Sequence, residues 1–126
     1  MKIIKICGRR ASGKTTKAIS DALNSNYKYI NYICANRECV RVMIDKYKKI
    51  SDRLIFITYN DIILMLRRST TLFTFRNNCV IYETNESKEM YENQDIIFNL
   101  FRNEGISKLI ITEKTDGPLE WKIIEN

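Results

Sequence analysis

Short apolar runs alternate along the chain with longer stretches in which apolar residues recur every three or four positions. The short runs are rich in Ile, Val and Tyr, and this composition predicts β-strands. They cover residues 2–7, 27–34, 53–58, 79–83 and 108–112. A further run at residues 119–124 follows a turn at Asp116, Gly117 and Pro118, so it predicts an antiparallel strand at the sheet edge.

The stretches between these runs have the periodicity of helices that bury one face. The first predicted helix covers residues 14–23. Three more helices are predicted from residues that can cap a helix N-terminus, and these caps are Asn36, Asn60 or Asp61, and Asn85 or Ser87. The last of these helices is expected to be long and to end before Gly105. Residues 69–78 fit no helix and suit either a short edge strand or an ordered loop.

Strands that alternate with helices over the whole length indicate the α/β class. We expect a mainly parallel five-stranded sheet with helices on both faces, extended by the antiparallel edge strand at the C-terminus. A length of 126 residues and an apolar content of 44% fit a single domain over residues 1–126.

Composition argues against a membrane protein and against a zinc protein. No apolar run approaches the length of about 18 residues typical of a membrane-spanning helix, and Lys5 interrupts the first run early, so we expect a soluble, cytoplasmic protein. The four cysteines have no C-x-x-C spacing and the chain has no histidine, which excludes the usual zinc ligand sets. We expect reduced cysteines in the core.

One short segment carries a chemical pattern. Residues 8–15 read G-x-x-x-x-G-K-T and lie between a predicted strand and a predicted helix. The glycines allow the backbone to curl so that successive N–H groups point inward, and the start of the helix adds the positive end of its dipole. This arrangement predicts binding of nucleotide phosphates. The predicted nucleotide-binding residues are Gly8, Arg9, Arg10, Ala11, Ser12, Gly13, Lys14, Thr15 and Thr16.

Two side chains of this segment have distinct expected roles. Lys14 is expected to reach the outer phosphates as a point charge, and the Thr15 hydroxyl is expected to help hold a magnesium ion that bridges them. The expected ligands are therefore ATP and Mg²⁺.

Polar residues also end two of the later predicted strands. Glu83 ends the run at residues 79–83, and Thr112 ends the run at residues 108–112. Ligands of parallel sheets bind outside the carboxyl ends of the strands, so Glu83 and Thr112 are expected beside the loop that follows Gly8.

Taken together, these residues resemble those of the P-loop NTPases, and the resemblance covers nearly the whole chain. Residues 8–16 are similar to the Walker A segment of the RecA-like branch, including the large terminase subunits that package viral DNA, which often carry an arginine within the loop as Arg9 and Arg10 do. The resemblance implies catalytic roles for Lys14, Glu83 and Thr112. Within these roles, Glu83 would bind magnesium together with Thr15, and Thr112 would sense the terminal phosphate.

The acidic pair of that family is incomplete in this chain. Its first acid holds magnesium and its second polarises the attacking water. If Glu83 is the first acid, Thr84 replaces the second; if Glu83 is the second, Tyr82 replaces the first. Glu86, three residues further on, could substitute. Loss of the residue that positions water costs orders of magnitude in rate, so we expect weak or partner-dependent ATPase activity.

Other functions remain open at this point. A GTPase is one alternative: residues 113–116 read Glu-Lys-Thr-Asp, which differs from the guanine-binding pattern N-K-x-D by Glu in place of Asn. A small nucleotide kinase is another, but it needs an acceptor site for which a chain of 126 residues leaves little room. A non-catalytic nucleotide- or protein-binding module derived from such an ATPase is a further alternative.

The charge pattern bears on partners. A net charge of +6 favours an acidic partner such as nucleic acid. Arg37, Arg41 and Lys48 lie close in angle on the second predicted helix and indicate either a solvated face or a phosphate-backbone contact. Residues 70–75, flanked by arginines, would also suit a loop that contacts a nucleic-acid strand. A protein partner or a homo-oligomer is the alternative. The resemblance to the viral packaging ATPases implies a protein of viral or mobile-element type.

Overall fold

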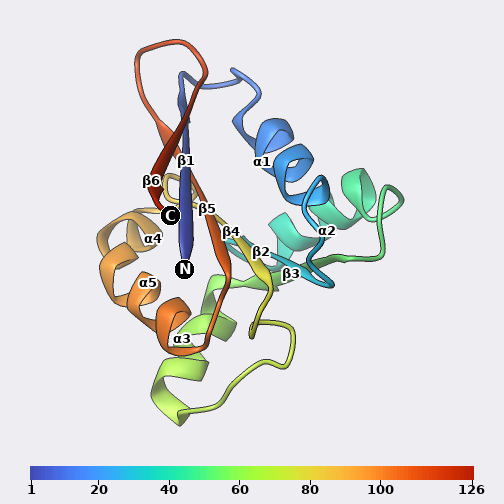
Figure 1. The fold of residues 1–126 in the computed structure, drawn as a ribbon, viewed down its shortest axis with the longest axis vertical. Helices are drawn as coiled ribbons and strands as arrows, with labels where there is room; N and C mark the ends of the chain where they lie inside the picture. Colours follow the sequence, from blue (N-terminus) through green and yellow to red (C-terminus); the bar gives the residue numbers. More distant parts are fainter.

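The computed structural model describes residues 1–126, which form one six-stranded sheet flanked by helices (Figure 1). The strands are β1 (Lys2–Gly8), β2 (Ile30–Cys34), β3 (Leu54–Thr58), β4 (Cys79–Glu83), β5 (Lys108–Lys114) and β6 (Glu120–Glu125). The helices are α1 (Lys14–Leu23), α2 (Arg37–Tyr47), α3 (Tyr59–Arg68), α4 (Lys88–Glu92) and α5 (Gln94–Asn103).

The strand order is β3-β2-β4-β5-β1-β6, and β6 is the one strand that runs antiparallel to its neighbour. This arrangement confirms the α/β class and the predicted antiparallel edge strand. Because β6 returns along β1 and Ile3 pairs with Glu125, the two chain termini lie side by side (Figure 1). In the middle of the sheet β5 lies between β1 and β4, so the carboxyl ends of these three strands are neighbours.

Alternate strand residues face two separate cores. On one face, the sheet packs against α1 and α2, and the strand residues on that side include Ile6, Ile81 and Ile110. On the other face it packs against α3, α4 and α5, and the strand residues there include Val80 and Tyr82. The strands β1, β2, β4 and β5 are therefore buried on both sides, as their nearly continuous apolar sequences require, whereas the edge strand β6 is largely exposed.

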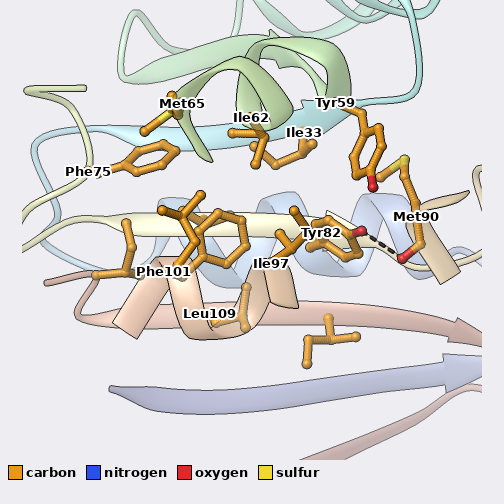
Figure 2. Close-up of a cluster of buried hydrophobic side chains, with 14 of the residues drawn as sticks. Ile33, Tyr59, Ile62, Met65, Phe75, Tyr82, Met90, Ile97, Phe101 and Leu109 are labelled. Atoms are coloured by element: carbon orange, nitrogen blue, oxygen red, sulfur yellow. Dashed lines mark hydrogen bonds between the residues drawn. The ribbon is translucent and has the colours of Figure 1, made fainter. Parts of the chain in front are cut away.

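The second of these cores is rich in aromatic side chains (Figure 2). Phe101 of α5 meets Phe75 edge to face, with ring centroids 5.8 Å apart, and it lies 6.2 Å from the ring of Tyr82. The buried hydroxyl of Tyr82 donates a hydrogen bond of 2.7 Å to the carbonyl of Met90, drawn as a dashed line in Figure 2. Phe101 thus joins α5, β4 and the segment that precedes β4.

Two helix boundaries differ from the sequence prediction. The third helix begins at Tyr59 rather than after Asn60 or Asp61, because Thr58 is its N-cap: the Thr58 hydroxyl accepts from the Asp61 N–H, and the Asp61 carboxylate accepts from the Thr58 N–H. The predicted long helix is divided into α4 and α5 at Asn93, whose side-chain amide donates to the Tyr59 hydroxyl. The prediction of Ser87 as a cap is confirmed.

Residues 69–78 form turns and not an edge strand. The segment is held by the buried side chain of Asn31 on β2, which donates to the carbonyls of Thr74 and Cys79 and accepts from the Thr74 hydroxyl at 2.6 Å. An ordered loop, one of the two predicted alternatives, is therefore the correct one.

None of the five helices combines the length and apolar character needed to cross a membrane. All four cysteines are free, and three of them, Cys7, Cys34 and Cys79, are buried.

The aromatic core gives a direct test of stability. Phe101 has no exposed surface, so Phe101→Ala is expected to lower the free energy of unfolding by about 3–5 kcal/mol through lost burial and the cavity left behind. Urea denaturation followed by circular dichroism measures this change. Ile96 lies on the same helix but is 59% exposed, and Ile96→Ala should change the stability by less than about 0.5 kcal/mol. Equal losses in the two variants would contradict the packing.

Candidate functional site

The loop between β1 and α1 has an unusual backbone. Ala11 has φ of 60° and Gly13 has φ of 93°, so the chain turns twice through the left-handed region within three residues. Ala11 adopts this conformation at an energetic cost, because its Cβ disfavours it. Two hydrogen bonds hold the loop in place: the Arg9 N–H donates to the Gly117 carbonyl at 3.0 Å, and the Ser12 N–H donates to the Arg9 carbonyl at 3.1 Å.

Gly8 lies in a crowded position at the start of this loop. A Cβ at this position would collide with the Ser12 hydroxyl and lie 3.3 Å from the backbone of Leu119. The Ser12 hydroxyl is itself buried and has no hydrogen-bond partner. The loop is therefore a tight cradle that contains one orphaned polar atom, which is a sign that a polar ligand completes it.

Helix α1 begins at the end of this loop without a side-chain cap. Its N-cap is Gly13, no side chain accepts a hydrogen bond from its first turn, and no acidic residue lies in that turn. The free N–H groups and the positive end of the helix dipole are thus available to an anion. Lys14 opens the helix, and its ammonium group donates to the Arg9 carbonyl at 2.9 Å.

Glu83 and Thr112 lie beside this helix start. They are paired in register at the carboxyl ends of β4 and β5, and both are almost fully buried. The Thr15 hydroxyl donates a short hydrogen bond to the Glu83 carboxylate, which links the first turn of α1 to the end of β4. The structure therefore brings together Lys14, Thr15, Glu83 and Thr112, as the sequence predicted.

The neighbours of Glu83 point elsewhere. Tyr82 faces the opposite core, where its hydroxyl is bound to Met90 (Figure 2). Thr84 is buried, and both its N–H and its hydroxyl donate to the carbonyl of Thr112, at 3.2 and 2.7 Å. Of these three residues, only Glu83 presents its side chain to the loop.

These groups line one cavity of about 700 Å³. The predicted residues that line it are Arg10, Ala11, Ser12, Gly13, Lys14, Thr15, Thr16, Glu83 and Thr112. Gly8 and Arg9 shape the loop from behind and do not line the cavity.

The cavity has a second wall that the sequence did not predict. It is formed by Tyr32 of β2 and by one face of α2, with Cys39, Val42, Met43, Lys46 and Tyr47. The spacing of these α2 residues is that of a single helix face. Met43 and Tyr47 do pack in the core, whereas Val42 is 57% exposed at the edge of the cavity. The exposure of Val42 is visible only in the structure, so the sequence carried no signal for this wall.

A second carboxylate also lines the cavity. Glu86 lines the cavity, and its pKa is raised to about 7, first by the partial burial of its carboxyl and then by the neighbouring Glu83 carboxyl. Burial, followed by the charge of Glu83, also raises the pKa of the Tyr32 hydroxyl beyond the range in which tyrosine ionises in water. Tyr32 is thus a neutral hydroxyl on the floor of the cavity.

The predicted basic stripe is only partly present. Arg37 and Arg41 are exposed on α2, but Lys48 is half-buried and its ammonium group donates to the carbonyls of Leu54, at 2.5 Å, and Asp52, at 3.4 Å. The inclusion of Lys48 was therefore wrong, because this lysine ties the end of α2 to the start of β3.

Comparison with protein-family models, with curated proteins and with solved structures returned no match for this chain. The structure contains no cluster of three or more His, Cys, Asp or Glu side chains arranged to hold a metal ion.

The raised pKa of Glu86 predicts how stability depends on pH. The folded chain binds the Glu86 proton more tightly than the unfolded chain does, so stability falls as the pH rises from the ordinary value of 4.5 to about 7. Glu86→Gln removes this dependence. Over this window the wild type should lose about 1 kcal/mol more than the variant, less than the full shift implies, because solvent screens an exposed carboxyl. Urea denaturation at pH 4.5, 6 and 8 measures this difference, and parallel curves would contradict it.

Proposed function

We propose that this chain is a small P-loop protein that binds ATP with Mg²⁺ and hydrolyses it slowly or with the help of a partner. One observation carries the proposal: the uncapped start of α1 and the Glu83 carboxylate face the same cavity and are joined by the Thr15 hydrogen bond. A phosphate chain needs the first of these groups and its metal ion needs the second.

The chemistry of the cavity fits both ligands. The orphaned hydroxyl of Ser12 and the open N–H groups of α1 are donors that suit phosphate oxygens. Thr15 and Glu83 supply the hard oxygen atoms that Mg²⁺ prefers, and Mg²⁺ is commonly held by one or two protein groups plus phosphates and water. Bound there, the ion would neutralise negative charge on the outer phosphates. The lack of a larger cluster of metal ligands is therefore compatible with the proposal.

Lys14 has a position from which it can change partner. Its present acceptor is the Arg9 carbonyl, a neutral group on the same loop. An outer phosphate is a stronger acceptor for an ammonium group than a carbonyl is, because both partners are charged. We propose that Lys14 leaves Arg9 for the terminal phosphate when ATP binds.

The order of the strands favours the RecA-like branch within the P-loop class. β5 lies between the loop strand β1 and the acidic strand β4, so Thr112 lies between the loop and Glu83. This is a suitable place for a residue that contacts the terminal phosphate. Slow hydrolysis is expected from Thr84, since the position next to Glu83 has neither a carboxylate nor access to the cavity.

A small nucleotide kinase is a second candidate, and the wall formed by α2 favours it. Tyr32, Val42 and Met43 continue the cavity beyond Lys14 and Thr15, on the side of β2 and α2. A second ligand there would lie next to the outer phosphates, where a phosphoryl acceptor belongs. A non-catalytic nucleotide-binding module is the remaining candidate. Thr84 favours it, because this residue supplies no carboxylate at the position next to Glu83.

Nucleotide binding is tested by one pair of lysine variants. Millimolar ATP with Mg²⁺ should raise the thermal stability of the wild type by several degrees, because the ligand binds only the folded state. Lys14→Ala should abolish this rise. Lys17→Ala is the matched control, since Lys17 is exposed on the next turn of α1 and does not line the cavity. Differential scanning fluorimetry measures both. No rise in the wild type would refute ATP binding.

We further propose that Arg37 and Arg41 contact the phosphate backbone of nucleic acid. Such binding is independent of sequence and falls steeply with salt. Replacing both arginines by Glu should lower the affinity at least about tenfold at low salt and flatten the salt dependence, while ATP binding is retained.

Fluorescence anisotropy with labelled single- and double-stranded DNA provides the measurement. Reversal of Lys28 and Lys49, which are exposed outside α2, is the control because it changes the net charge equally. If neither form of DNA binds the wild type at about 50 mM salt, the contact does not exist, because backbone-driven binding is strong under that condition.

A further inference from the structure

The turn after β4 places a second carboxylate in the site. Residues 83–86 form a tight turn in which the Glu86 N–H donates to the Glu83 carbonyl at 3.2 Å. Two contacts with β5 hold the turn. The Thr84 hydroxyl donates to the Thr112 carbonyl, and the Asn85 side-chain oxygen accepts from the Lys114 N–H at 2.7 Å. The chain consequently folds back and returns Glu86 to the cavity that Glu83 lines.

The Glu86 side chain is free to act on a ligand. It forms no ion pair, and its main-chain N–H is the group that closes the turn. In contrast, the Glu83 carboxylate is buried and is engaged by Thr15. Two adjacent carboxylates in one cavity thus have different surroundings: Glu83 is enclosed near the helix start, and Glu86 is exposed to water.

We propose that Glu86 is the second acid of the site and that it binds the water molecule which attacks the terminal phosphate. The inference rests on the proposed ATP binding. The second acid of an acidic pair would be residue 84, and Glu86 lies two positions further along the chain. The turn of residues 83–86 brings the Glu86 side chain back to the same cavity. Thr84 is buried and does not line the cavity, whereas the Glu86 side chain does. Glu86 therefore takes the role that the residue next to Glu83 would otherwise have.

The reaction is the hydrolysis of ATP to ADP and phosphate. The oxygen of the water molecule forms a bond to the terminal phosphorus, and the bond from that phosphorus to the oxygen bridging to the middle phosphate breaks, with its electron pair leaving on ADP. The water proton passes to the Glu86 carboxylate and from there to solvent, because this side chain is exposed. Arg10, Lys14 and Thr112 also line the cavity and can hold the phosphate oxygens during the step.

The test compares Glu86→Gln with Glu89→Gln. Glu89 is an exposed acid in the first turn of α4 and does not line the cavity, so its variant matches the change in charge three residues away. Calorimetry first measures the affinity of each protein for ADP with Mg²⁺. Single-turnover hydrolysis of radiolabelled ATP then uses the protein in excess, so that slow reactions are detected.

We expect Glu86→Gln to lower the single-turnover rate about 100-fold or more and to leave the affinity for ADP within about twofold. A second readout is independent of turnover: the affinity for ADP with aluminium fluoride, which imitates the attacked phosphate and its water, should fall at least about tenfold, while the affinity for a non-hydrolysable ATP analogue is retained. Glu86→Asp should recover part of both losses. Glu89→Gln should behave as the wild type.

Failure of the inference is distinguishable from failure of the proposed function. If the wild type does not bind ADP or ATP, the proposed function is wrong and the role of Glu86 falls with it. If Glu86→Gln binds ADP with aluminium fluoride as tightly as the wild type does, or hydrolyses ATP at the wild-type rate, Glu86 is not the second acid while the ATP site stands.

Discussion

The hydrogen bond from Thr15 to Glu83 is the contact on which the site depends. It joins residues 68 positions apart in the sequence and connects the first turn of α1 to the end of β4. A polar side chain as deeply buried as that of Glu83 is costly unless it is hydrogen-bonded. The helix start provides this partner, so the position of α1 and the burial of the Glu83 side chain are coupled. A ligand that attracts Thr15 or Glu83 must act on both.

The strand between them makes this contact possible. β5 separates β1 from β4, and its end contributes Thr112 to the cavity and the Thr112 carbonyl to the turn of residues 83–86. The Lys114 N–H, two residues further along β5, holds Asn85 of the same turn. The loop after β1 and the turn after β4 therefore both adjoin the carboxyl end of one strand, which fixes the positions of Lys14 and Glu83 relative to each other.

The elements of the fold could be predicted from the sequence because apolar runs and cap residues are local signals. The boundaries were less predictable where a distant partner decides them, as at Asn93, whose amide binds Tyr59 of another helix and divides a stretch that reads as continuous. The same distinction applies to the site. The loop of residues 8–16 is a local pattern, but the placement of Lys48 depends on carbonyls at Asp52 and Leu54, and the exposure of Glu86 depends on a turn that no periodicity reveals.

The alternation along β4 shows how strictly the fold and the site are linked. Cys79 and Ile81 pack under α1 and α2, Val80 and Tyr82 pack under α3 and α5, and Glu83 then falls on the side of α1. A shift of the register by one residue would place Tyr82 beside Thr15 and bury the Glu83 carboxylate among the aromatic rings of Figure 2, without a partner. The aromatic core on the far face therefore does more than stabilise the sheet. By accepting Tyr82 and binding its hydroxyl, it selects the register in which Glu83, and no neighbour, reaches the loop.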